Sequence, residues 1–137
     1  MNITISILDI HWLSVIIATL LAFGIGGLWY SPVLFGNIWL KEIKHIDEDP
    51  NKSNMALIFG FAFLLNFVSA IVLDLVIGLE SSLFDGILKS LMVCGAFVVT
   101  ALGINYLFSS KSLNLFLIDA GYFLFYYAVM GAVLGAW

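Results

Sequence analysis

The sequence predicts an all-α integral membrane protein: a bundle of four transmembrane helices, with a short interfacial helix after the first. Composition is the first observation behind this prediction, since 63% of the 137 residues are hydrophobic and 10% are charged. A globular domain averages about 25% charged residues, and a soluble domain this small cannot hide so much apolar surface from water. The second observation is the length of the apolar runs, which matches the thickness of a bilayer.

Four apolar runs predict the four transmembrane helices, at about residues 10–29, 54–77, 86–108 and 113–137. Each is long enough, because about 20 helical residues cross the hydrocarbon core. Spanning strands would be shorter and would alternate polar with apolar side chains. The last two connections are short, which favours antiparallel neighbours. We therefore expect residues 1–137 to form a single transmembrane domain.

The segment after the first run is amphipathic. Pro32 cannot continue a helix with its own N–H, and it biases Ser31 away from helical angles. Apolar and polar residues then mix irregularly, and Trp and Tyr favour the headgroup zone. We expect an interfacial helix over about residues 33–43. The interfacial motif comprises Trp29, Tyr30, Ser31, Pro32, Phe35, Gly36 and Trp39.

The lysines predict the orientation in the membrane. Lys41, Lys44 and Lys52 lie in the first loop and Lys111 in the third, whereas Lys89 lies on the opposite side. Positively charged residues favour the cytoplasmic side. We therefore expect a multi-pass protein of the cell membrane, with the first and third loops in the cytoplasm and both termini outside.

Charge and cysteine content argue against several classes of site. The net charge is −4, and the five basic residues are all Lys, so the chain has neither a basic patch for nucleic acid nor an Arg clamp for phosphate. Cys94 is the single cysteine, which excludes an intramolecular disulfide and a cysteine-based metal site. We expect no nucleic-acid partner, no cofactor and no metal site.

Several motifs carry a resemblance to a known family. They are Trp29-Tyr30-Ser31-Pro32 with Leu34-Phe35-Gly36 and Trp39, Gly-Ile-Asn-Tyr-Leu-Phe at 103–108, and Ile-Asp-Ala-Gly-Tyr at 118–122. On these motifs the chain resembles, over nearly its whole length, the membrane family called domain of unknown function 1761. The resemblance implies a small four-helix membrane protein and no particular activity. Family members often have Asn-Ala-Gly-Tyr-His where this chain has residues 119–123, so a mechanism that used that His is in doubt here.

Polar residues at one depth form the first candidate site. Asn105 lies near the end of the third run and Asp119 near the start of the fourth, so antiparallel helices place them at similar depth. Asp119, Tyr122 and Tyr126 share one helix face by their i, i+3, i+7 spacing. A carboxylate near the centre of a membrane costs about 2.5–3.5 kcal/mol or more and normally faces other helices or water. The candidates are Asp119, Asn105, Tyr122, Tyr126 and, on the second run, Asn66.

Two interpretations of this site stay open. One is an ion or proton site. The other is a structural network in which Asp119 bonds to Asn105 or to a Tyr hydroxyl. At the outer side, His11 and Asp74 are further candidates, because His titrates near neutral pH. Charged residues at span ends commonly just reach the headgroups, and one His near Asp9 is a weak metal motif.

Small residues predict how the helices associate. In lipid, helices pack through small side chains and polar contacts rather than by escape from water. Ala18, Ala22 and Gly26 form a four-residue ladder in the first run, and Gly131 and Gly135 form another in the fourth. The fourth run has more small residues than one contact between two helices needs, which favours a homo-oligomer.

These features predict a small oligomeric channel or carrier for an ion or small solute, with Asp119, Asn105 and Tyr122 along a polar path. The alternative is a non-catalytic membrane module that binds lipid or another membrane protein through the interfacial motif. The expected partners are the lipid bilayer, further copies of the chain and, under the alternative, a membrane protein. Ser, His and Asp do not share a common depth, as nucleophilic catalysis would require, so we do not expect an enzyme.

Overall fold

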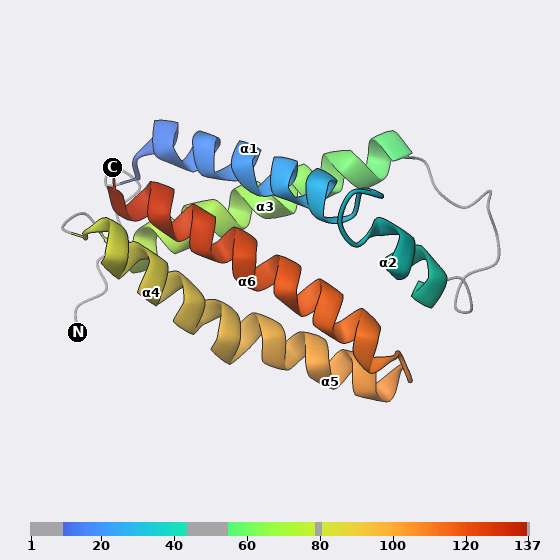
Figure 1. Ribbon diagram of the computed structural model, residues 1–137. Coiled ribbons are helices and arrows are strands. Elements are labelled where there is room, and N and C mark those ends of the chain that lie inside the picture. Colours follow the sequence, from blue (N-terminus) through green and yellow to red (C-terminus); the bar gives the residue numbers. More distant parts are fainter. Residues whose placement is uncertain (1–9, 44–54, 79–80, 137) are drawn as a thin grey trace.

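The computed structural model describes residues 10–43, 55–78 and 81–136, which form helices and short turns, with no strand among them (Figure 1). The first, second and fourth spans are α1 (Trp12–Trp29), α3 (Met55–Ile77) and α6 (Leu113–Ala136). The third span joins α4 (Leu83–Val93), the π-helical segment η2 (Cys94–Val99) and α5 (Thr100–Phe108). These four spans are long and apolar enough to cross a membrane. The predicted fold class is confirmed.

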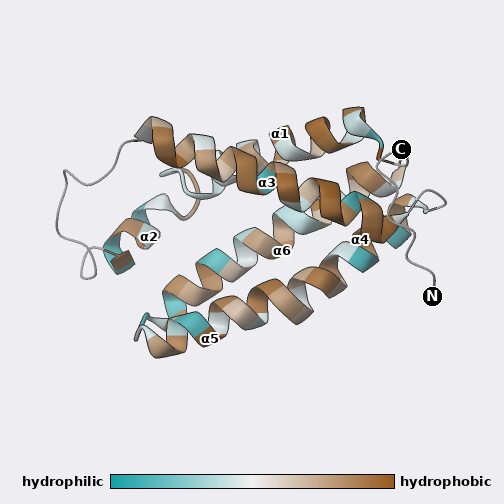
Figure 2. Cartoon of the chain, turned by 180° about the vertical axis from the view of Figure 1, so that it is seen from behind, coloured by the Kyte–Doolittle hydropathy of each residue, from teal (hydrophilic) through white to brown (hydrophobic). Residues whose placement is uncertain are grey.

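The helices consist mostly of hydrophobic residues along their whole length (Figure 2), and many of these residues are exposed on the outside of the bundle. Large side chains such as Leu65 and Phe97 are 65% and 71% exposed. A helix that is apolar all round suits a membrane rather than water, because lipid contacts its outer face. The chain is therefore a multi-pass membrane protein.

Helix α6 lies in the middle of the bundle, with α1 on one side and α4 and α5 on the other (Figure 1). Its crossing with α4 is close enough for backbones to touch. A Cβ added at Gly86 or at Gly131 would overlap the carbonyl oxygen of the other residue, and one at Gly135 would lie 2.8 Å from the Cα of Gly86. Small residues allow such close approach in membranes. The glycines of α6 thus serve a seam within the chain.

The third span begins at Leu83 rather than near residue 86, because Ser82 and Asp85 form a capping box. The backbone N–H of Asp85 donates to the Ser82 side chain at 3.1 Å, and the Asp85 carboxylate accepts from the Ser82 N–H at 3.4 Å. Such a pair satisfies two N–H groups that a helix start leaves without partners. The preceding helix, α3, ends at Ile77, and the next residue, Gly78, has a positive φ of 82° that suits glycine.

Helix α2 (Gly36–Ile43) is shorter than expected, because residues 31–35 form a turn rather than its first turn of helix. The N–H of Phe35 donates to the carbonyl of Trp29 at 3.0 Å, and the N–H of Gly36 donates to Ser31 at 2.9 Å. A Cβ at Gly36 would overlap the carbonyl oxygen of Tyr30. Glycine therefore lets the chain fold back on the end of α1.

Candidate functional site

Asp119 of α6 is 7% exposed and is the one buried acidic side chain among the described residues. The hydroxyl of Tyr30 donates to its Oδ1 at 2.5 Å, and the hydroxyl of Tyr106 donates to its Oδ2. Tyr30 follows directly after α1, and Tyr106 belongs to α5. Three segments of the chain therefore meet at one carboxyl group, and each of its oxygens accepts a hydroxyl hydrogen.

The turn after α1 positions Tyr30. Its neighbour Trp29, the last residue of α1, donates from Nε1 to the carbonyl of Ile118 at 3.0 Å. Two consecutive residues at the end of α1 thus bond to two consecutive residues of α6. The Trp29 ring lies 4.7 Å from that of Phe35, centroid to centroid. It also lies against Gly121, where an added Cβ would be only 3.1 Å from the ring. Trp29 and Tyr30 of the interfacial motif therefore connect the end of α1 to α6 within the bundle.

Burial raises the pKa of the Tyr30 hydroxyl, and the hydrogen bond to Asp119 and the charge of that carboxylate raise it further. A phenol whose pKa lies above its ordinary value of about 10 keeps its proton at neutral pH. Tyr30 therefore keeps the hydroxyl hydrogen that it donates to Asp119 in this structure.

All five tyrosines of the chain gather along α6. Ring centroids are 5.3 Å apart between Tyr30 and Tyr122, 4.8 Å between Tyr122 and Tyr126, and 4.9 Å between Tyr126 and Tyr127. Tyr106, the fifth, bonds to Asp119 from α5. The rings of Tyr30, Tyr122, Tyr126 and Tyr127 form a continuous series that we call the tyrosine ladder. It leads from Asp119 over eight residues of α6, or about 12 Å at 1.5 Å per residue.

Tyrosine hydroxyls bond to Asp119, as one of the two expectations had it, but the other expected partner, Asn105, does not. Asn105 is exposed, and the next residue, Tyr106, faces the carboxyl group instead. One residue turns a helix by about 100°, so neighbours at positions 105 and 106 face different ways. Tyr122 and Tyr126 join the cluster through ring contacts. Asn66 is half-buried on α3, whose side chains make none of the hydrogen bonds to Asp119 described above.

Tyr30 and Tyr106 are the partners of Asp119 that the sequence analysis did not name for this site. The sequence indicates a headgroup anchor at Tyr30, because Tyr favours that zone. Its contact with Asp119 joins residues 89 positions apart, and no local pattern predicts such a contact. A signal for Tyr106 did exist, since it shares the motif at residues 103–108 with Asn105. Helical phase alone does not say which of two adjacent polar residues faces a given neighbour.

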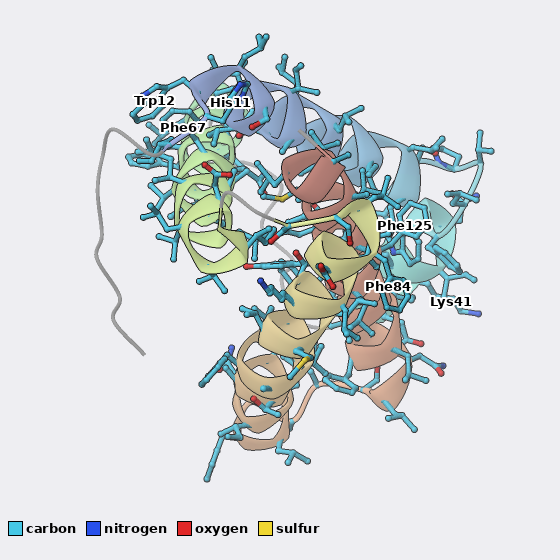
Figure 3. The ribbon with its side chains drawn as sticks, turned by 90° about the vertical axis from the view of Figure 1, so that its left-hand side faces the viewer. His11, Trp12, Lys41, Phe67, Phe84 and Phe125 are labelled. Atoms are coloured by element: carbon cyan, nitrogen blue, oxygen red, sulfur yellow. The ribbon has the colours of Figure 1, made fainter. Side chains whose placement is uncertain are left out.

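His11 and Asp74 form a structural joint at the other end of the bundle. The carboxylate of Asp74 accepts from the backbone N–H of His11 at 3.1 Å, which ties the start of α1 to α3. The His11 ring accepts from the N–H of Ser14 at 3.4 Å and so caps α1. The ring contact between Trp12 and Phe67 lies beside it (Figure 3). Within the described residues, no three or more His, Cys, Asp or Glu side chains group to hold a metal ion.

Helix α2 contacts the loop between α5 and α6. The carboxylate of Glu42 accepts from the hydroxyl of Ser112 at 2.5 Å and from the side-chain amide of Asn114 at 3.3 Å. The Ser112 hydroxyl also accepts from the N–H of Leu115 at 3.1 Å and caps α6. The acidic Glu42 thus lies at the positive end of the α6 dipole. This contact places the end of α2 beside the third loop.

The lysines of the described part divide between the two ends of the bundle. Lys41 of α2 points away from the helices (Figure 3), and Lys111 lies in the third loop at the same end. At the opposite end, Lys89 donates to the carbonyl of Ile77 at 2.8 Å. Lys44 and Lys52 lie outside the described residues. The side of the membrane on which each end lies stays a prediction.

Comparison with known proteins identifies the family. The family model described as "Protein of unknown function (DUF1761)" matches residues 13–135, so the chain belongs to this family and the resemblance noted in its motifs is confirmed. The matched region contains the turn after α1, Tyr106 and Asp119. No curated protein and no solved structure matches the chain.

Proposed function

We propose that this member of the family is a small membrane carrier or channel in which Asp119 binds the ion that crosses the bilayer. The observation behind the proposal is a carboxyl group buried within a membrane span, with a hydroxyl donor on each oxygen. Ionisable side chains inside a membrane are expensive and commonly mark an ion or proton path.

The two hydroxyl donors fit this role. Hydrogen bonds to an ionised carboxylate favour its charged form, which is the form that attracts a cation. A phenol also accepts hydrogen bonds through its own oxygen, so Tyr30 and Tyr106 can turn from donors into acceptors when the carboxylate is neutralised. The site can therefore alternate between an empty and an occupied state with little movement of the backbone.

Ion flux into liposomes tests the proposal. Purified protein is reconstituted, and uptake of protons, Na⁺ and K⁺ is measured for the native chain, for Asp119→Asn and for a matched control, Asp74→Asn. The control removes an acid from another span and keeps the oxygen that accepts from the backbone of His11. We expect cation flux above that of empty liposomes, lost in Asp119→Asn and retained in Asp74→Asn. No flux in the native chain, or equal flux in Asp119→Asn, would contradict the proposal.

A second candidate function is a non-catalytic module that binds lipid or another membrane protein. The observation in its favour is the apolar surface of the turn and α2, where Val33 is 80% and Leu40 56% exposed. Against it, Trp29, Tyr30 and Gly36 of the interfacial motif are engaged within the chain. Affinity purification of the native chain, compared with a Val33→Ser, Leu40→Ser variant, tests this candidate. A specific membrane partner lost from the variant would support it, and the same partners in both samples would contradict it.

The homo-oligomer also stays a prediction. Gly131 and Gly135, which suggested it, lie against Gly86 within the chain. These glycines of α6 are therefore already occupied by a contact between α4 and α6. Chemical cross-linking in native membranes, followed by separation by size, tests whether copies associate through other faces. Our proposal places the ion site within one bundle and does not need a second copy.

A further inference from the structure

We infer that the ion that Asp119 takes up is a proton, and that it is exchanged through the hydroxyl of Tyr106 with water at the end of the bundle where the third loop lies. The inference rests on the proposed function and names its substrate and its port. It follows from the kind of groups around Asp119 and from the position of Tyr106 between the carboxyl group and the loop.

The groups that face Asp119 suit a proton better than a metal ion. Both carboxylate oxygens accept hydroxyl hydrogens, and the adjacent carbonyl of Ile118 accepts from Trp29. A hard metal cation needs several oxygen ligands at once: Ca²⁺ takes about six to eight, and Mg²⁺ takes about six in octahedral geometry. Such an ion would have to displace both phenols. A proton needs one carboxylate oxygen and the reversal of one hydroxyl.

The charged groups near the site are arranged around Tyr106. The ammonium of Lys111 lies 4.6 Å from the centroid of the Tyr106 ring, whereas Tyr30 bonds to the other carboxylate oxygen of Asp119 and packs against Tyr122. From α2, the carboxylate of Glu42 is bonded to Ser112 and Asn114 near Lys111. Tyr106 therefore contacts both Asp119 and a charged residue of the third loop.

The titratable groups of α3 and α4 belong to other contacts. Asp74 bonds to the backbone of His11, Asp85 belongs to the capping box, and Lys89 bonds to the end of α3. Cys94 is buried in the core of the bundle. The proton of Asp119 thus exchanges with the third-loop end without an acid or base from these helices.

The exchange step conserves atoms and charge. A hydronium ion at the loop gives a proton to the Tyr106 oxygen while the Tyr106 O–H bond breaks and its proton joins Oδ2 of Asp119. Tyr106 ends as it began, water is released, and Asp119 changes from the carboxylate to the carboxylic acid. Release to the same side follows the reverse order.

Proton flux tests the inference. Liposomes carry a pH-sensitive dye, and a K⁺ gradient with valinomycin supplies the driving potential. Tyr106→Phe keeps the ring and removes the hydroxyl, and the matched control Tyr127→Phe removes a hydroxyl more than two helical turns from Asp119 along α6. We expect proton flux to fall by about 100-fold in Tyr106→Phe, the scale of a lost proton-transfer group, and to stay near the native rate in Tyr127→Phe.

Different results separate this inference from the proposed function. Flux of Na⁺ or K⁺ that depends on Asp119, without proton flux, would overturn the proton assignment and leave the proposed function standing. Unchanged proton flux in Tyr106→Phe would overturn the port. Absence of any flux dependent on Asp119 would instead overturn the proposed function.

A second measurement follows proton uptake in the native protein itself. Infrared difference spectra of the native protein, recorded as pH falls, should show a carboxylic-acid band that is missing from Asp119→Asn. The hydrogen of that band should exchange with deuterium oxide, and it should exchange more slowly in Tyr106→Phe where that variant folds. A band that does not change with pH would contradict proton uptake by Asp119.

Discussion

The hydroxyl of Tyr30 donates a 2.5 Å hydrogen bond to Oδ1 of Asp119, across 89 residues of sequence. It lies beside the bond from Trp29 to the carbonyl of Ile118, so the turn after α1 is held to α6 by two adjacent contacts. The conformation of this turn depends on Gly36, which packs against the backbone of Tyr30. A motif that suggests a membrane-surface anchor is therefore part of the buried site.

Replacing Tyr30 with Phe should destabilise the bundle by about 1–2 kcal/mol. Loss of a partner from a buried polar group costs about 1–3 kcal/mol, whereas hydrogen bonds within membranes average about 0.6 and reach about 1.7 kcal/mol. The upper part of the membrane range applies because the acceptor is a carboxyl group that is 7% exposed. Unfolding by sodium dodecyl sulfate from mixed micelles measures the change.

A double-mutant cycle gives the control for this prediction. In an Asp119→Leu background the Tyr30 hydroxyl has lost its acceptor, so Tyr30→Phe should then cost clearly less than in the native chain. An equal cost in both backgrounds would show that the bond contributes nothing to stability and that Tyr30 acts through its ring alone.

Replacing Gly131 with Ala should destabilise the protein by about 3 kcal/mol or more, because its Cβ would overlap the backbone of Gly86 and the hydroxyl of Ser90. Extra methyl groups in packed sites cost about 1–3 kcal/mol, and a backbone neighbour cannot rotate away. Gly60→Ala is the matched control, since an added Cβ there meets nothing within 4 Å. Thermal unfolding in detergent measures both variants, and equal stability of the two would contradict the close crossing of α4 and α6.

The sequence was sufficient to predict the four spans, because a run of about 20 apolar residues has few alternatives to crossing a membrane. It was also sufficient to mark Asp119, since a carboxyl group in such a run needs partners. The sequence did not identify those partners. Tyr30 reaches Asp119 because the chain turns after α1, and this turn depends on Gly36. The choice between Asn105 and Tyr106 depends on the rotation of α5 about its axis. This rotation follows the packing of the third span, which includes the π-helical segment η2.

Alkaline pH should destabilise the native protein, and less so the Tyr30→Phe variant. The pKa of Tyr30 is raised in the folded state by burial and by Asp119, above its ordinary value of about 10. Below that value the hydroxyl keeps its proton in both states, so its contribution to stability is complete. As pH rises above about 10, the unfolded chain loses this proton and the folded chain keeps it, so stability falls. Unfolding in detergent between pH 8 and pH 11, measured as a function of pH, should give a shallower slope in Tyr30→Phe, and parallel slopes would refute the prediction.

The two ends of the bundle should differ in their access to the outside of the cell. Lys41 and Lys111 lie at one end and Lys89 at the other, and positive residues favour the cytoplasmic side. Single cysteines at Ser109, which is exposed in the third loop, and at Ser81, in the second, report the two ends. The native Cys94 is buried, so it contributes little background. A membrane-impermeant maleimide should label Ser81→Cys in intact cells and Ser109→Cys only after permeabilisation. The reverse pattern would invert the orientation and place the Tyr106 port on the outside, while the internal geometry of the Asp119 site would be unchanged.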